Sequence, residues 1–265
     1  NVFNEQYNGD RKTDLASGFV DVTLTVEKRV DEQFTLTPGG RYYFDLSAMN
    51  IPGTVNSNLP DSTLHYVPFT YAGTVDAYSL KNEADTDTTS YEHSLFIADY
   101  AMTHTVSWDS LNIQGLIFGK EYTSDGIDYT LRAPSVGNGW TGNGEDERGT
   151  PTNNEWDTIL DKANQTGGSI KNWMDLMSWG QDASARVRIF RTSRGLASAR
   201  FWGSWPCTQP DDYNGYRPVL ELPADLAADS LKVVALVTAG YMPGEDQNWI
   251  NIIVKNGESF KAPSA

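Results

Sequence analysis

The chain has 265 residues, and 35 acidic against 20 basic side chains give it a formal net charge of −15. A surface this acidic repels the phosphates of nucleic acids and of anionic membranes, so we expect neither as a partner, and no apolar run approaches the roughly 18–20 residues that span a bilayer. The single cysteine, Cys207, excludes an intrachain disulfide and a cysteine-based zinc site, and three histidines are too few for a histidine-rich metal centre.

The N-terminal third is predicted to consist of short strands. Phe19–Val30 alternates apolar and polar residues, as a strand with one buried face does. Phe34–Leu36 and Tyr42–Leu46 flank a Pro-Gly-Gly turn and predict a hairpin. The acidic stretch Asn82–Ser90 predicts a loop. We expect residues 1–90 to form a β-rich N-terminal extension, either built into the domain that follows or a small module of its own.

The middle of the chain combines strands with one clear helix. Ser94–Tyr100 predicts a strand, and Leu116–Tyr122 and Ile127–Arg132 predict a hairpin around a Ser-Asp-Gly turn. The helix is predicted over Asn153–Ala163, where apolar residues recur at the spacing of one helical face and an asparagine can cap the start.

The last third returns to strands. Arg186–Thr192 and Tyr216–Leu222 predict two strands, and Leu231–Thr238 and Trp249–Val254 predict two more. The chain is therefore expected to be an α+β protein with many short strands, one or two helices, long loops and a β-rich C-terminal tail. The tail, residues 224–265, resembles the opening of a β-grasp repeat of Gram-positive surface proteins, which implies further domains of the same surface protein.

Four motifs in a fixed order carry a second resemblance. They are TPTNNEW (150–156), GSIKNW (168–173), SRGLAS (193–198) and GYRPV (215–219). Their order and spacing resemble the C-type-lectin-like domain of formylglycine-generating enzymes and their relatives. The resemblance implies a C-type-lectin-like fold for residues 91–223.

The same resemblance implies structural roles for several large side chains. Trp156 is expected to enter the core from the helix, and Trp173 and Trp179 are expected to fill the loop-rich half of the domain. Arg217 is a candidate for a fixed ion pair with Glu155 or Asp157; an exposed strand arginine is the alternative.

The resemblance does not extend to the catalytic residues of the family. Its oxidising members use a pair of cysteines near the position of RGLASAR, where this chain has Ala-Ser-Ala at 197–199 and its one cysteine lies downstream. A single cysteine cannot form a pair that binds copper or exchanges with a thiol. The three histidines do not form the iron-binding pattern of the sulfoxide-synthase relatives. We expect no enzyme; a formylglycine-generating-type enzyme is the alternative.

The same scaffold carries the variable proteins of diversity-generating retroelements, which randomise the segment before a G-F/Y-R strand. Residues 184–213 resemble such a segment, because aromatic and basic residues gather there in an otherwise acidic chain. Aromatic and arginine side chains dominate binding hot spots. The predicted ligand-binding residues are Arg186, Arg188, Phe190, Arg191, Arg200, Phe201, Trp202, Trp205, Cys207 and Tyr213. A satellite core formed by the three aromatics at 201, 202 and 205 is the alternative.

These patterns predict a non-catalytic adhesin or receptor-binding module, displayed outside a bacterial cell or on a phage tail. Its ligand would be a protein or a glycan on a host or neighbouring cell. No cofactor is expected to be required, although Asp125–Asp128 and Asn143–Glu147 offer oxygen ligands that suit Ca²⁺. Polar turns are the alternative for both segments. A structural cell-wall module without a specific ligand is the alternative function.

Overall fold

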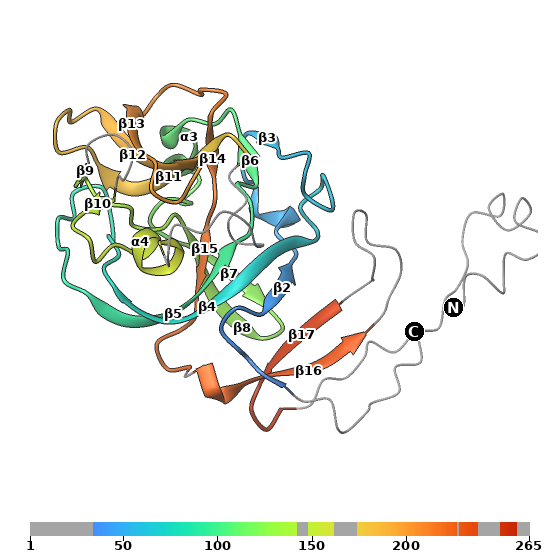
Figure 1. The fold of residues 1–265 in the computed structure, drawn as a ribbon. Coiled ribbons are helices and arrows are strands. Elements are labelled where there is room, and N and C mark those ends of the chain that lie inside the picture. Colours follow the sequence, from blue (N-terminus) through green and yellow to red (C-terminus); the bar gives the residue numbers. More distant parts are fainter. Residues whose placement is uncertain (1–33, 142–147, 162–173, 227, 238–249, 259–265) are drawn as a thin grey trace, which may run out of the picture. The chain divides into compact units, whose positions relative to one another are not determined.

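The computed structural model describes residues 34–141, 148–161, 174–226, 228–237 and 250–258, all within one compact unit, Val30–Phe260. This part of the chain is mostly β-sheet with two short α-helices, α3 (Trp108–Ile113) and α4 (Glu155–Leu160) (Figure 1). It is therefore a β-rich α+β fold. Neither helix of the described residues has the length and apolarity of a membrane span. The strand predicted over Phe19–Val30 lies outside the described residues, as does Trp173.

A first six-stranded sheet joins the N-terminal segment to the rest of the unit. Its strands, in spatial order, are β2 (Arg41–Phe44), β4 (Val67–Ala77), β5 (Tyr91–Ala98), β15 (Val219–Glu221), β8 (Ile127–Arg132) and β7 (Lys120–Ser124). All neighbouring strands of this sheet are antiparallel. Because β4 pairs directly with β5, the described residues before position 90 are built into the same sheet as those after it.

A second six-stranded sheet carries the segment 184–213. Its strands, in spatial order, are β13 (Trp202–Pro206), β12 (Phe190–Leu196), β11 (Leu176–Ala183), β14 (Asn214–Tyr216), β6 (Thr103–His104) and β3 (Thr54–Val55). β11 and β14 are parallel, and the other neighbours are antiparallel. β13 is the outermost strand at one side of this sheet.

Two smaller sheets complete the described strands. The C-terminal strands β16 (Leu231–Val237) and β17 (Ile250–Lys255) pair with each other, and β16 also pairs with β1 (Phe34–Thr35). The predicted hairpin between the first two strands is therefore wrong, since β1 pairs across the chain with β16 and β2 pairs with β4. A two-stranded hairpin is formed by β9 (Gly139–Trp140) and β10 (Gly149–Thr150), and two 3₁₀ turns lie at η1 (Ser47–Met49) and η3 (Ala228–Ser230).

The β7–β8 hairpin has the predicted turn. Asp125 and Gly126 both adopt positive φ angles, 52° and 74°. This is the requirement of a two-residue turn whose twist matches that of the strands. The Asp-Gly sequence is therefore what fixes the strand register, Tyr122 opposite Tyr129.

Both helices begin at a polar cap. Asn154 caps α4 by accepting a hydrogen bond from the Asp157 amide, which confirms the predicted helix start, while the helix itself ends at Leu160. Ser107 caps α3 by accepting a hydrogen bond from the Ser110 amide.

The core lies on both faces of the first sheet. Phe44 is at its centre on one face, with edge-on contacts to Phe69, Phe96 and Tyr129 at centroid distances of 5.3, 5.2 and 5.6 Å. On the other face, Trp156 of α4 packs with residues of β4 and β5. In Figure 1, α4 lies between β5 and the strands β11–β13. The helix thus connects the first sheet to the part of the second sheet that bears segment 184–213.

Four buried tryptophans each use the indole N–H. Trp108, Trp156, Trp179 and Trp202 donate to the backbone carbonyls of Gly180, Ala199, Val106 and Gly137 at 2.9, 2.7, 2.8 and 3.3 Å. A buried indole N–H without a partner would destabilise the fold. The predicted burial of Trp156 and Trp179 is confirmed, since both are fully buried.

Candidate ligand-binding surface

Segment 184–213 is a β-hairpin with its flanking turns. The strand predicted from position 186 begins only at Phe190, because residues 184–189 form the turn from β11 into β12. Two of the three clustered aromatics, Trp202 and Trp205, lie on strand β13, and Phe201 directly precedes it. β13 is the edge strand of the sheet, whereas β12 is buried on both faces from Arg191 to Gly195.

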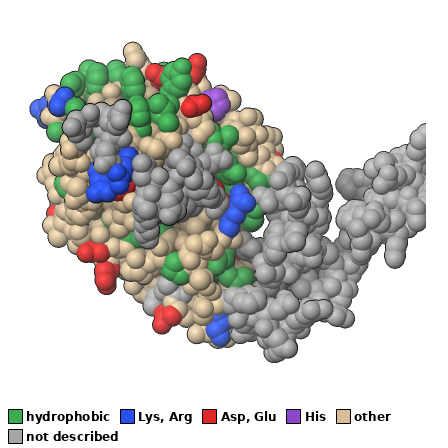
Figure 2. All heavy atoms as spheres, in the orientation of Figure 1, with side chains coloured by type: hydrophobic (Ala, Val, Ile, Leu, Met, Phe, Trp, Pro, Cys, Tyr) green, Lys and Arg blue, Asp and Glu red, His purple; other side chains and the backbone are tan. Residues whose placement is uncertain are grey.

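Large apolar side chains are exposed on this segment more than elsewhere. They are Val187 (41%), Ile189 (65%), Phe201 (37%), Trp205 (38%) and Tyr213 (59%). In the rest of the described chain, the exposed large hydrophobics are Tyr91 and Ile113 alone. Figure 2 shows hydrophobic side chains gathered at the end of the unit where Figure 1 places β12 and β13. Five of seven such residues thus belong to one stretch of 27 residues, Val187–Tyr213.

The predicted ligand-binding residues fall into three groups by exposure. Those that are exposed are Arg186, Arg188, Phe201, Trp205 and Tyr213. Those that are partly buried are Phe190, Arg200 and Cys207. Those that are buried are Arg191 and Trp202. The prediction of a displayed side chain is wrong for the last two.

Trp202 is buried because it faces into the unit from β13. Its ring lies 4.9 Å from that of Trp140, and its indole N–H bonds to Gly137. The guanidinium of Arg186 lies 3.7 Å from the Trp140 ring centroid. The exposed Arg186 therefore lies on the ring of Trp140, which packs at a tilt against Trp202, and this contact restricts the positions that the arginine side chain can take.

Arg191 is buried because it faces the opposite side of the same hairpin, toward α3. Its guanidinium lies 4.4 Å from the ring of Trp108 and forms an ion pair with Glu83 of the acidic loop. It also donates to the backbone carbonyls of Arg188 and Phe190. Arg191 thus connects the 184–189 turn, the loop 81–90 and helix α3.

Gly203 leaves the space in which the Trp205 indole lies against the sheet. A Cβ atom on Gly203 would lie 3.2 Å from the Trp205 indole nitrogen and 2.7 Å from the terminal methyl of Met177. The absence of a side chain at 203 therefore leaves room for both groups. The indole is supported on one side and exposed on the other, as a flat contact surface for a ligand requires.

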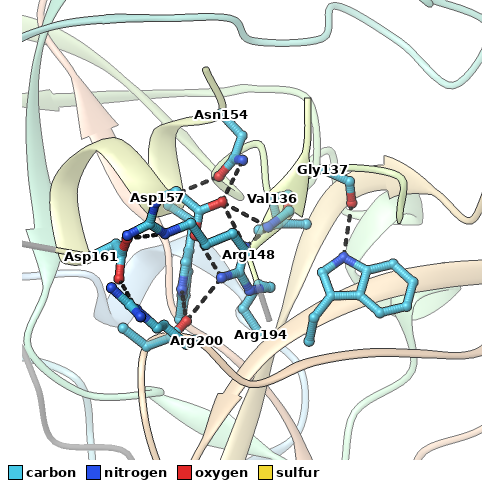
Figure 3. Close-up of polar contacts among 12 residues, drawn as sticks. Val136, Gly137, Arg148, Asn154, Asp157, Asp161, Arg194 and Arg200 are labelled. Carbon is cyan, nitrogen blue, oxygen red and sulfur yellow. Dashed lines mark hydrogen bonds and ion pairs between the residues drawn. The ribbon is translucent and has the colours of Figure 1, made fainter. Parts of the chain in front are cut away.

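A buried ion pair between Arg194 and Asp157 fixes this hairpin to helix α4. Arg194 of β12 donates to both carboxylate oxygens of Asp157 in α4, at 3.1 and 2.6 Å, and to the carbonyls of Val136 and Ala199 (Figure 3). Asn154 and the Gly149 amide bond to the same carboxylate. The pair is fully desolvated, but its hydrogen bonds satisfy both partners, so it fixes the hairpin relative to α4.

A second carboxylate fixes the end of the hairpin turn. Asp161, just after α4, binds Arg200 and Arg148, each through an Nε nitrogen 2.5 Å from a carboxylate oxygen (Figure 3). Arg200 was predicted as a ligand contact, and in the structure its charge is already paired with Asp161. Phe201 follows it directly and is exposed, so the ion pair holds the start of β13 in place beside an exposed ring.

Cys207 has the environment of a protonated thiol. Burial and the neighbouring Asp109 carboxylate raise the pKa of the Cys207 thiol. The thiolate is the nucleophilic form of cysteine. This environment favours a contact residue over a reactive one.

Of the two calcium candidates, only Asp125–Asp128 is described. Asp128 accepts a hydrogen bond from Thr123, and Ser124 donates to Asp125, as expected of a polar hairpin turn. No cluster of three or more acidic, histidine or cysteine side chains suited to a metal occurs in the described ranges. The segment Asn143–Glu147 lies outside them.

Arg217 does not pair with either of the two carboxylates proposed from the sequence. Glu155 is bound by Arg132 and His93, and Asp157 by Arg194. Arg217 is buried and donates to the Ala98 carbonyl. Burial lowers the pKa of its guanidinium to about 10, against the opposing effect of the neighbouring Asp99 charge. The carboxylate that acts on Arg217 is thus that of Asp99, the residue directly after β5.

Sequence reasoning missed three residues of this surface. Trp140 supports Arg186, and Val187 and Ile189 are exposed beside Arg188. The alternation of arginine with apolar residues in RVRIFRT suggested a strand with a buried apolar face. Since the chain turns at 184–189 before β12 begins, that face is exposed instead. The solitary tryptophan in the glycine-rich loop was the available signal for Trp140.

No family model matches the chain, and neither a curated protein nor a solved structure matches it. The resemblance to C-type-lectin-like domains therefore stays a prediction.

Proposed function

We propose that the chain is a non-catalytic binding module and that the exposed face of segment 186–213 contacts a protein or glycan ligand. The observation that carries the proposal is the concentration of exposed large apolar side chains there, since such patches mark interaction sites. Exposed arginines at 186 and 188 border them. Tryptophan, tyrosine and arginine are the residues that most often dominate binding energy.

The support beneath these side chains favours binding without rearrangement. The Arg194–Asp157 pair and the Asp161 ion pairs hold both strands of the hairpin. A preorganised surface loses little conformational entropy when a ligand binds. We place this surface on a C-type-lectin-like scaffold of an extracellular or phage-tail protein. In support, the helix with Trp156 and the strands with SRGLAS and GYRPV, which carry the resemblance, form the frame of the hairpin.

The test is a binding screen of the full chain against a glycan array and a displayed random octapeptide library. The triple variant Phe201→Ser, Trp205→Ser, Tyr213→Ser is expected to lose every ligand that the wild type selects. The control variant Ile113→Ser removes an exposed apolar residue of α3 and is expected to bind as the wild type does. Ligands that bind the triple variant equally well would place the site elsewhere.

A further inference from the structure

One side of β13 pairs with no other strand among the residues that the structure describes, so an added strand can pair there. The other side pairs with β12. Gly195 donates to the Phe201 carbonyl and Cys207 donates to the Ile189 carbonyl, so the odd-numbered residues from 201 to 207 face β12. In an antiparallel ladder the intervening residues direct their backbone groups away. The amides and carbonyls of Trp202 and Ser204 therefore point outward from the sheet.

The side of β13 that faces away from β12 is short and has a defined end. Pro206 has the same outward orientation but no N–H, and its carbonyl accepts a hydrogen bond from Gln209. Two residues, Trp202 and Ser204, thus offer two donors and two acceptors. An extended segment can satisfy all four groups with two residues of its own that are two positions apart.

The surroundings of this side favour an acidic segment. The turn that carries the exposed Arg186 and Arg188 lies at the Pro206 end of β13, on the side where β12 pairs, because Cys207 donates to the Ile189 carbonyl; a peptide longer than the two paired residues extends past this end toward the two arginines. Strand β13 itself has no charged residue. A second copy of the chain that paired through its own β13 would therefore bring no carboxylate to these arginines.

We propose that β13 binds an extended, acidic peptide segment of a partner protein as an added strand. The outward backbone groups of Trp202 and Ser204 pair with the peptide, the exposed ring of Trp205 contacts its alternate side chains, and Arg186 and Arg188 bind its carboxylates. This inference rests on the proposed function and specifies how the ligand is held.

The experiment starts with random octapeptides displayed on phage and selected on the full chain. We expect the selected sequences to be rich in Asp and Glu alternating with β-branched or aromatic residues. The winners are synthesised as free peptides, and their affinities are measured by fluorescence anisotropy for the wild type and two variants. Ser204→Pro removes one outward donor without affecting the ladder to β12, and Ser204→Ala is the matched control that keeps the donor.

The expected result is that Ser204→Ala binds like the wild type and that Ser204→Pro binds about tenfold more weakly, since one backbone hydrogen bond is lost. The variant should fold, because Pro206 already occupies the same orientation two residues on. A second measurement avoids the variant altogether: methylating alternate peptide amides should weaken binding to the wild type in one register and not in the other.

Each contrary outcome has a distinct meaning. If Trp205→Ala abolishes binding while Ser204→Pro and amide methylation have no effect, the strand addition is wrong and the proposed function stands. If the selected peptides bind Ser204→Pro and Trp205→Ala as tightly as they bind the wild type, both proposals are wrong. If no peptide is enriched on the wild type, the strand addition is wrong, and the glycan array decides the proposed function. If sedimentation shows a wild-type dimer that Ser204→Pro converts to a monomer, the occupant is a second copy and the acidic peptide is wrong.

Discussion

Glu155 shows how single side chains keep a charge inside this fold. Its carboxylate is fully buried and is bound by Arg132, His93 and the Ser135 amide. Burial alone would raise the pKa of this carboxyl, but the Arg132 charge and the hydrogen bonds outweigh burial and hold the pKa at about 2, below its ordinary 4.5. Because the folded pKa lies below the unfolded one, the contribution of Glu155 to stability is complete above about pH 4.5 and is lost as the pH falls toward 2.

Glu155→Gln is therefore expected to lower the free energy of unfolding at pH 7 by roughly 3–5 kcal/mol, since it leaves the buried Arg132 without its main partner. It should also flatten the pH dependence of stability between about 4.5 and 2. Urea unfolding at a series of pH values measures both effects. Glu92→Gln, an exposed carboxylate on the same strand as His93, is the control and should change neither. An unaltered acid slope in Glu155→Gln would contradict the assignment.

Trp202 and Trp205 give a second prediction at this scale, because they differ in role although they lie three positions apart. Trp202→Ala removes a buried ring, and we expect it to destabilise the fold by about 3–5 kcal/mol. Trp205→Ala removes an exposed ring and should change stability by less than about 1 kcal/mol. Chemical denaturation of the two variants side by side tests this. Equal losses would mean that both rings are part of the core.

At the scale of elements, Arg191 connects a loop to the sheet. It pairs with Glu83 in the loop 81–90, whose backbone amides at Lys81, Ala84 and Asp87 bond to side chains within the same loop. Arg191→Met keeps an apolar contact with Trp108 and removes the ion pair. We expect faster hydrogen exchange in residues 81–90 and little change in the rest of β12.

Arg188→Met is the matched control for that exchange experiment, because Arg188 is exposed in the neighbouring turn. It should leave the exchange of residues 81–90 as it is in the wild type. If both variants or neither accelerate exchange, then Arg191 does not hold the loop.

The elements also show what local sequence can predict. The Asp-Gly turn of β7–β8 and the Asn154 cap of α4 were predicted because a few adjacent residues determine each of them. Helix α3 was missed, although Ser107 caps it, because its six residues give too short a pattern for helical periodicity.

Pairings between distant segments could not be predicted in the same way. β1 joins β16 almost 200 residues later, and no local pattern contains that partner. The exposure of each residue on the candidate surface also depends on distant segments and could not be predicted from local sequence. The residue types of 186–213 indicated a binding segment, but only what packs against each face of β12 and β13 decides that Trp202 and Arg191 are buried.

At the scale of the whole described unit, the C-terminal strands belong to the main core. Leu231 and Val233 of β16 and Ile253 of β17 join the same buried cluster as Phe44. Ending the chain after Asp225 would expose that part of the cluster to water. We expect the truncated protein to melt at a clearly lower temperature than the full chain or to be insoluble, as measured by circular dichroism and soluble yield. A truncated protein with an unchanged melting temperature would show that the tail is an independent module.

On β13 and in the turns that flank the hairpin, exposed residues lie beside the residues that hold the fold. Arg194 and Trp202 point inward to Asp157 and Gly137, whereas Phe201, Trp205 and the 186–189 turn are exposed. We therefore expect substitutions at these exposed positions to change the free energy of unfolding by less than about 1 kcal/mol each. A protein engineer could exploit the same division: a library randomised at Arg186, Val187, Arg188, Ile189, Phe201 and Trp205 should consist mainly of folded members, each presenting a new recognition surface on one unchanged frame.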